Sequence, residues 1–203
     1  MITRWDKWYA KDNLNQDERI LAAPPSQSAE NAAAAFLARG KRRILDLACG
    51  VGRETFHLES RGLAVIGVDA SPNGLQVARQ RRLERGARCA SVVADARQLP
   101  FENESFDGVY CFGLLHEFTG KTKTQDVQQV MAEIERVLCT HGLLVLTVLS
   151  GDPERGLPQV QFFTRHMFER AASDLHAIEI KMYNDIGCTN RTDYRIWYGL
   201  FER

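Results

Sequence analysis

The segment Ile44–Thr55, ILDLACGVGRET, joins a carboxylate to a glycine turn and is a candidate for holding a ligand. Gly50 and Gly52 let the backbone approach a ligand where a Cβ atom would collide. A helix N-terminus should follow, and it favours negative charge. A dinucleotide would place its pyrophosphate here, but Thr55 stands at the third glycine of that pattern and Asp46 lies close by. Because two spaced glycines alone are unspecific, the neighbouring strands must decide what the turn holds.

Three carboxylates follow one another at expected strand ends: Asp46, Asp69 and Asp95. Asp46 suits a cationic ammonium group, Asp69 a pair of ribose hydroxyls, and Asp95 an amino group on a purine, with Ala96 offering its backbone N–H to the ring. S-adenosylmethionine carries all these groups without a phosphate, and its carboxylate suits the N–H groups of the glycine turn. The alternatives are a satisfied strand-end carboxylate for Asp46 and a turn cap for Asp95.

The elements that must position these residues can be read from apolar periodicity, caps and breakers. Strands are predicted at Arg43–Leu47, Ala64–Val68, Ala90–Ala94, Phe106–Phe112, Leu143–Leu149, His176–Tyr183 and Tyr194–Phe201. Helices are predicted at Ala29–Ala38, at Val51–Arg61 and from Pro72, with Ser71 as the cap, to about Arg85. A further helix is predicted over Gln125–Leu138, ended by Gly142, and another after the Thr164 cap, where Phe163 and Phe168 would form a hydrophobic staple.

Strands that alternate with helices predict an α/β fold, namely a Rossmann-like, doubly wound sheet. The sheet should have seven strands, mostly parallel, with helices on both faces and a C-terminal antiparallel hairpin. We expect a single domain over residues 1–203, with a helical cap or leader at 1–42 and the core at 43–203. Ligands of such sheets bind beyond the carboxyl ends of the strands.

With these motifs in order, the chain resembles the class I S-adenosylmethionine-dependent methyltransferases, over roughly Arg43 to Leu149. The resemblance rests on LDLACGVG, GVDAS, VVADARQLPFENESFD, VYCFGLLHEF and EIERVLCTHGLLVLT. Ala48 replaces the usual first glycine, and Thr140-His141 replaces a Pro-Gly turn. The cofactor contacts that the resemblance and the motifs imply are Asp46, Ala48, Cys49, Gly50, Gly52, Asp69, Ala70, Asp95, Ala96, Phe112 and Leu115.

The leader WDKWYAKDN also resembles small-molecule methyltransferases of the tellurite-resistance and UbiE-like kind. In such relatives an N-terminal segment folds over the cofactor. The similarity implies that Tyr9 covers the methionine end of the cofactor and that Trp5 borders the substrate pocket.

His116, just beyond the fourth strand, is the candidate catalytic base, because an imidazole titrates near neutrality. The alternative is a scaffold histidine bonded to the backbone, and Glu117 competes for the same role. Phe162 and Phe163 are candidate walls of the substrate pocket. Arg53 suits either a ligand carboxylate or an ion pair with a neighbouring glutamate.

The expected reaction is in-line methyl transfer to a small molecule, achieved mainly by positioning in an apolar pocket and yielding S-adenosylhomocysteine. The alternatives are a catalytically silent cofactor-binding partner subunit and an RNA or protein methyltransferase. NAD(P)-dependent reduction is disfavoured by Thr55 and Asp46.

Composition limits the partners. The 26 basic residues equal the 26 acidic ones, which argues against nucleic acid held through phosphates. No signal peptide and no apolar run of about 18 residues is visible, so we expect a cytoplasmic protein that is not in a membrane. The five cysteines form no CxxC pair and the histidines show no metal-ligand spacing, which predicts reduced thiols and no metal. The oligomeric state is not indicated.

Overall fold

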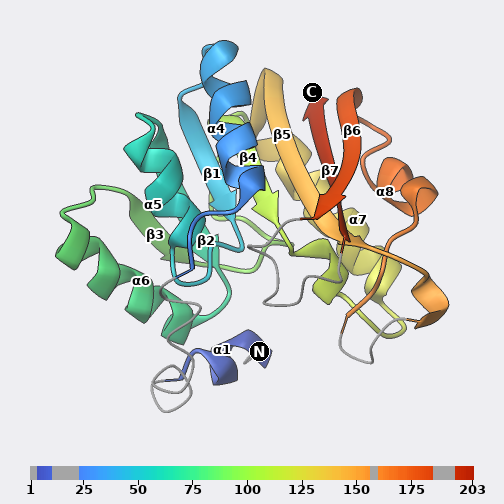
Figure 1. Ribbon diagram of the computed structural model, residues 1–203, viewed down its shortest axis with the longest axis horizontal. Coiled ribbons are helices and arrows are strands. Elements are labelled where there is room, and N and C mark those ends of the chain that lie inside the picture. Colours follow the sequence, from blue (N-terminus) through green and yellow to red (C-terminus); the bar gives the residue numbers. More distant parts are fainter. Residues whose placement is uncertain (1–3, 11–22, 156–159, 185–194) are drawn as a thin grey trace.

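The computed structural model describes residues 4–10, 23–155, 160–184 and 195–203, and it has a central sheet covered by helices (Figure 1). The strand order is β3-β2-β1-β4-β5-β7-β6. The strands are β1 (Arg43–Leu47), β2 (Ala64–Asp69), β3 (Ala90–Val93), β4 (Phe106–Phe112), β5 (Leu138–Ser150), β6 (His176–Asn184) and β7 (Arg195–Glu202). The first five strands pair in parallel, whereas β7 is antiparallel to both β5 and β6. The predicted mostly parallel sheet with a C-terminal antiparallel hairpin is confirmed.

The helices occupy both faces of the sheet. They are α1 (Arg4–Trp8), α4 (Gln27–Ala38), α5 (Arg53–Ser60), α6 (Pro72–Arg85), α7 (Lys123–Val137) and α8 (Arg165–Ala171), with short 3-10 turns η1 (Leu115–Glu117) and η2 (Pro153–Arg155). Alternate strand residues face opposite layers, as the period of two requires. Ile44 and Tyr110 pack with α4 and α5, whereas Leu45 and Val109 pack with α7 and α8.

Local sequence signals account for several helix boundaries. Ser26 and Ser71 cap α4 and α6 by accepting hydrogen bonds from backbone N–H groups three residues on, and Thr164 caps α8 in the same way. Gly86 ends α6 in the left-handed conformation, in which glycine pays no steric penalty. Both residues of the predicted staple, Phe163 and Phe168, are buried.

Three of the predicted boundaries that were wrong have a clear physical cause. The first helix of the Rossmann-like core begins at Arg53 rather than Val51, because the turn continues through Gly52 in a left-handed conformation. The α4 helix begins at Gln27 rather than Ala29, because Ser26 supplies the cap. Gly142 does not end α7, since that helix stops at Val137 and the next strand begins immediately.

The segment before Gly142 forms an irregularity within β5. Leu138 pairs with Phe106, but Leu143 already pairs with Gly108, so extra residues bulge from the strand between them. His141 there has a φ of 60°, and a Cβ on Gly142 would lie 2.7 Å from the Cys139 carbonyl oxygen. The glycine is therefore required by a tight turn inside the strand.

Parallel pairing brings the carboxyl ends of the first strands to one edge of the sheet. Asp46 pairs in register with Gly67 on one side and Tyr110 on the other, and Asp69 pairs with Val93. This edge faces α1, at the bottom of Figure 1. None of the described helices is long and apolar enough to cross a membrane.

Candidate functional site

The turn between β1 and α5 is strongly constrained. Ala48, Gly50 and Gly52 have φ values of 66°, 53° and 80°, all in the left-handed region. Gly52 is the N-cap residue of α5 and makes no side-chain cap hydrogen bond. A Cβ on Gly50 would lie 2.6 Å from the hydroxyl of Tyr9. Ala48 adopts this conformation at a steric cost that glycine would avoid.

Asp69, the last residue of β2, holds this turn in place. Its Oδ2 accepts a hydrogen bond from the Gly50 N–H at 2.8 Å, and its Oδ1 accepts one from the Ser71 N–H at 2.8 Å. Burial raises the pKa of this carboxyl, while the two N–H donors oppose that shift. The carboxylate therefore lies at the contact between the glycine turn and the start of α6.

Asp46 is more deeply buried, with 1% of its surface exposed. Its Oδ2 accepts a hydrogen bond from Thr55 Oγ1 at 2.6 Å. Burial raises the pKa of Asp46 to about 7, although the Thr55 hydroxyl opposes this. Thr55, which the sequence showed only as a departure from a dinucleotide motif, is thus the partner of this acid. The sequence feature that could have indicated this pairing is the position of Thr55 in the first turn of α5, nine residues after Asp46.

Asp95 is exposed and paired with a cation. Its carboxylate accepts from the backbone N–H of Arg97 at 2.9 Å and from the guanidinium, with Oδ2 2.6 Å from Nη2. Arg97 also donates from Nη1 to Asp126 on α7 at 2.7 Å. The hydrogen bonds from Arg97 lower the pKa of Asp95. The turn cap that the sequence offered as the alternative for Asp95 is present. Arg97, which sequence reasoning did not single out, links this carboxylate to α7.

The helix α1 lies against α6 at this edge of the sheet (Figure 1). Asp6 Oδ1 accepts hydrogen bonds from Ser71 Oγ at 2.7 Å and from the Asn73 N–H at 3.0 Å, at the N-terminus of α6. Arg4 pairs with Glu117 of η1 at 2.5 Å. This helix therefore bridges α6 and η1, and the sequence offered no local signal that Asp6 would help to anchor it.

The aromatic residues of α1 and the residue after it form one cluster over the glycine turn. The rings of Trp5 and Tyr9 stack with their centroids 5.7 Å apart. Cβ atoms placed on Gly50 and Gly74 would both lie within 3 Å of Tyr9. Burial raises the pKa of the Tyr9 hydroxyl, so it remains protonated. Tyr9 therefore lies between the glycine turn and the start of α6.

His116 is buried in η1, with 6% of its surface exposed. Its Nδ1 accepts a hydrogen bond from the Leu149 N–H at 3.3 Å. Burial, with a smaller contribution from the charge of Arg4, lowers the pKa of His116 to about 3. The imidazole is therefore neutral, and the nitrogen without a proton is already in use as an acceptor. This is the environment of a scaffold histidine.

The remaining candidates are distributed differently. Phe112 is half-buried, and Cζ of Arg53 lies over its ring, 5.6 Å from the ring centroid. Arg53 also forms an ion pair with Glu54 at 2.5 Å. Phe162 packs with Leu149 and Ile196, whereas Phe163 packs in the core beneath α7 and α8. The two phenylalanines that were candidate walls of the substrate pocket therefore belong to two different hydrophobic clusters.

The other implied contacts accompany the turn and the acids. Cys49 is buried, and burial raises the pKa of its thiol. Ala70 is exposed after Asp69, Ala96 is half-buried after Asp95, and Leu115 is fully buried in the core. Among the described residues, no group of three histidine, cysteine, aspartate or glutamate side chains is arranged to hold a metal ion. Cys188 lies outside the described residues.

Comparison with known proteins gives a consistent family. A family model described as "Methyltransferase domain" matches residues 45–146. The chain is 33% identical over 120 residues to the demethylmenaquinone methyltransferase of Thermus thermophilus, covering 58% of this chain and 52% of that protein. It is 38% identical over 120 residues to the protein of that name from Deinococcus radiodurans, covering 57% and 46%. The chain thus spans about half the length of the curated relatives it matches.

Solved structures share the fold. The PH0226 protein from Pyrococcus horikoshii superposes with a TM-score of 0.69 at 21% identity, over 96% of this chain and 92% of that one. A SAM-dependent methyltransferase from Methanosarcina mazei gives a TM-score of 0.66 at 19% identity, over 79% and 92%. At these identities the likeness concerns the arrangement of strands and helices.

Proposed function

The chain belongs to the class I S-adenosylmethionine-dependent methyltransferases, and from this premise we propose that it transfers a methyl group to a small-molecule acceptor. The observation that carries the proposal is the arrangement at the carboxyl edge of the sheet. A glycine turn that leads into the N-terminus of α5 lies beside Asp69, with Asp46 on the strand before the turn and Asp95 after the next strand. Donors for one carboxylate and several acidic acceptors suit a phosphate-free, cationic nucleoside.

Each part of the site fits one part of S-adenosylmethionine. The N–H groups that begin α5 suit its carboxylate, because the helix N-terminus carries partial positive charge. Asp69 suits the ribose hydroxyls, and Asp95 with the N–H of Ala96 suits the edge of the adenine ring. The negative charge of Asp46 attracts the ammonium group across the turn rather than by direct contact, because the Asp46 carboxylate is hydrogen-bonded to Thr55. Tyr9 covers this assembly from α1.

Positioning is the main catalytic contribution that we assign to the chain. Bound S-adenosylmethionine supplies an electrophilic methyl group on a positively charged sulfur. The chain would hold the acceptor in line with the bond to that methyl group, which is worth up to about 7–11 kcal/mol. Phe112, half-buried at the end of β4, offers apolar surface there, and an apolar wall does not stabilise the charge that the reaction consumes.

We assign His116 to positioning rather than to proton transfer. A neutral imidazole whose Nδ1 accepts from Leu149 cannot take a proton there without breaking that hydrogen bond. Its carbonyl oxygen also accepts from the Gln161 N–H at 2.7 Å. His116 thereby joins η1 to β5 and to the segment that follows β5. A methyl acceptor that must lose a proton would release it to solvent or to another group.

The first test is calorimetric titration with S-adenosylmethionine, S-adenosylhomocysteine and NADPH. We expect the first two to bind and NADPH to give no heat, because its pyrophosphate would meet Asp46 and Asp69. Binding of NADPH alone would overturn the proposal.

The second test measures turnover. The isolated chain should form S-adenosylhomocysteine when a panel of small phenols, thiols and amines is supplied. A matched assay with bulk RNA and with protein extract should give no more product than buffer. Tight cofactor binding without turnover on any acceptor would instead identify a silent cofactor-binding subunit.

A further inference from the structure

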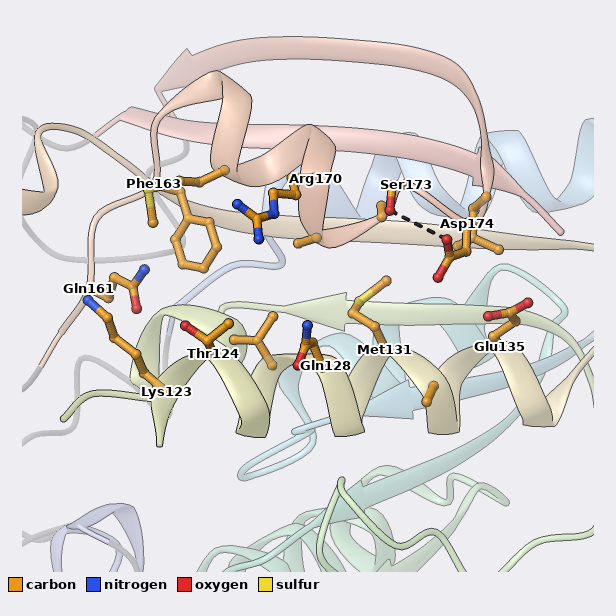
Figure 2. A pocket seen from close by; sticks show the side chains of 16 residues that line it. Lys123, Thr124, Gln128, Met131, Glu135, Gln161, Phe163, Arg170, Ser173 and Asp174 are labelled. Atoms are coloured by element: carbon orange, nitrogen blue, oxygen red, sulfur yellow. Dashed lines mark hydrogen bonds between the residues drawn. The ribbon is translucent and has the colours of Figure 1, made fainter. Parts of the chain in front are cut away.

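A groove of about 380 Å³ lies between α7 and α8, on the face of the sheet that these helices cover (Figure 2). Its volume is in the range of small-molecule sites. Of the residues discussed above as candidate site residues, only Phe163 lines it. The groove is therefore separate from the turn and the three acids assigned to the cofactor.

The walls of the groove are apolar and adaptable. Val127 and Met131 come from α7, Met167 comes from α8, and Phe163 and Leu175 complete the apolar lining. Methionine side chains adjust their shape and make favourable contacts with varied apolar surfaces. This part of the groove suits a flexible hydrocarbon body.

Charge is distributed unevenly along the groove. Lys123 and Arg170 lie toward one end with Gln161, whereas Glu135 and Asp174 lie toward the other (Figure 2). Asp174 accepts from Ser173 Oγ at 3.5 Å. Within the described part of the chain, the side chains of Lys123 and Arg170 have no ion-pair partner. An anionic group would therefore be drawn to the Lys123 end and repelled from the acidic end.

The side chain of Gln161 adds an unpaired hydrogen-bond acceptor at the cationic end of the groove. Its Oε1 is buried and has no hydrogen-bond partner within the described residues. Buried acceptors nearly always have a donor, so an unpaired one in a pocket wall calls for a donor from a bound molecule. A ligand that fits this end would carry a hydroxyl or N–H near its anionic group.

We propose that the groove binds a small amphipathic hydroxycarboxylic acid, with its carboxylate between Lys123 and Arg170 and its apolar body over Met131. The hydroxyl group donates to Gln161 Oε1. This site is distinct from the proposed methyl-transfer site. Because the Gln161 N–H holds the carbonyl of His116, an occupant would contact the segment that supports η1.

Methionine methyl groups provide a direct test. With [13C-methyl]methionine labelling, titration with 3-hydroxydecanoate, kept below its micelle-forming concentration, should shift the Met131 and Met167 signals. Met182, on the outer strand β6 and 39% exposed, should not move and is the internal control. Absence of saturable shifts at both Met131 and Met167 would overturn the proposal.

Matched probes and variants test each contact. Lys123→Gln and Arg170→Gln should each weaken binding about tenfold, whereas Arg165→Gln, on the same helix as Arg170 but outside the groove, should not. Decanoate should bind more weakly than 3-hydroxydecanoate to the natural chain, and the two should bind equally to Gln161→Leu.

Two outcomes would contradict the assigned chemistry. Equal binding of decylammonium and 3-hydroxydecanoate would show that charge does not select the occupant. Shifts at Met131 and Met167 that follow protein concentration without ligand, with dimer formation in sedimentation, would show that a second copy of the chain covers the groove.

Discussion

Asp46 and Asp69 end or nearly end their strands in buried surroundings, whereas Asp95 follows its strand in solvent. Burial raises the pKa values of Asp46 and Asp69, while the guanidinium of Arg97 lowers the pKa of Asp95. Two of the three acids are therefore held by neutral donors, a hydroxyl or backbone N–H groups, and the third is held by a cation at the surface. Side chains of one type, at equivalent places in the sheet, are thus prepared for binding in different ways.

The difference follows from what covers each strand end. The β1 end lies under α5, and the β2 end lies between the glycine turn and the α6 N-terminus, so these carboxylates lose water. The β3 strand is at the edge of the sheet, and Asp95, which follows it, is exposed. Buried groups make larger energetic differences when they are altered, because solvent does not screen them.

The largest expected effect is on stability, in Asp46→Asn. A folded-state pKa of about 7, above the ordinary 3.8, makes Asp46 contribute stability below pH 4 that is lost as the pH rises through 7. The asparagine of the variant does not ionise, so the variant does not lose this stability as the pH rises. Its free energy of unfolding should match that of the natural chain at pH 4 and exceed it at pH 8 by about 4 kcal/mol. Urea unfolding at both pH values measures this.

Asp107→Asn is the control for that experiment, with the opposite sign. Although burial opposes it, hydrogen bonds from Arg43 lower the pKa of Asp107, so its stabilising contribution is present at neutral pH and lost as the pH falls. Asp107→Asn should therefore be less stable than the natural chain at pH 7 and equal to it in strong acid. A pH-independent effect of Asp46→Asn would contradict the assigned burial.

Asp69→Ala should affect binding most among the exposed and half-buried positions. It removes the acceptor for the Gly50 and Ser71 N–H groups and the proposed partner of the ribose hydroxyls. We expect the Kd for S-adenosylmethionine to rise about 100-fold. Calorimetry measures it, with circular dichroism to verify folding, and Asp107→Asn at the opposite edge of the sheet should leave the Kd unchanged. An unchanged Kd in Asp69→Ala would remove Asp69 from the site.

Ala48→Gly tests the conformational strain of the buried turn. Ala48 has a φ of 66°, which glycine adopts without steric cost. The variant should be more stable by about 1 kcal/mol, since the steric gain exceeds the added entropy of the unfolded chain. Thermal unfolding measures the change. Ala70→Gly, at a residue without a positive φ, should be less stable than the natural chain, and stabilisation of both would refute the strain.

Arg97→Gln should have the smallest effect on binding, because the ion pair with Asp95 that it breaks lies at the surface, although it also removes the pair with Asp126 of α7. We expect cofactor affinity to fall about fivefold at most at pH 7. The loss should grow toward pH 3.5, because without Arg97 the pKa of Asp95 rises toward the ordinary 3.8 and protonation then removes the acceptor for adenine. Kd values measured across this range provide the test, with Arg79→Gln on the exposed face of α6 as the control. A loss independent of pH would mean that Arg97 acts only through α7.

Much of the fold could be predicted because its signals are local. The Ser71 cap, Gly86 and the apolar period of Phe106–Phe112 each define an element without help from distant residues. The boundary at Gly142 could not be predicted, because a glycine that ends a helix and a glycine that permits a bulge in a strand look the same in the sequence. Pairing with β4 decided between them.

Parts of the site were also visible in the sequence. The glycine turn and the acids after apolar strands could be identified because parallel strands bring their carboxyl ends together. Arg97 and Asp6 could not be identified in this way. Their partners lie 29 and 65 residues away, and charged side chains of this type usually face solvent.

The sequence by itself determined the strand–helix alternation, the family and the set of residues at the carboxyl edge, since these depend on periodicity and on motif spacing. Only the tertiary structure decided which acids are buried, that His116 is neutral and bonded to Leu149, and that Phe162 and Phe163 belong to different clusters. Burial and hydrogen bonding are properties of neighbours in space, and these neighbours come from distant parts of the chain.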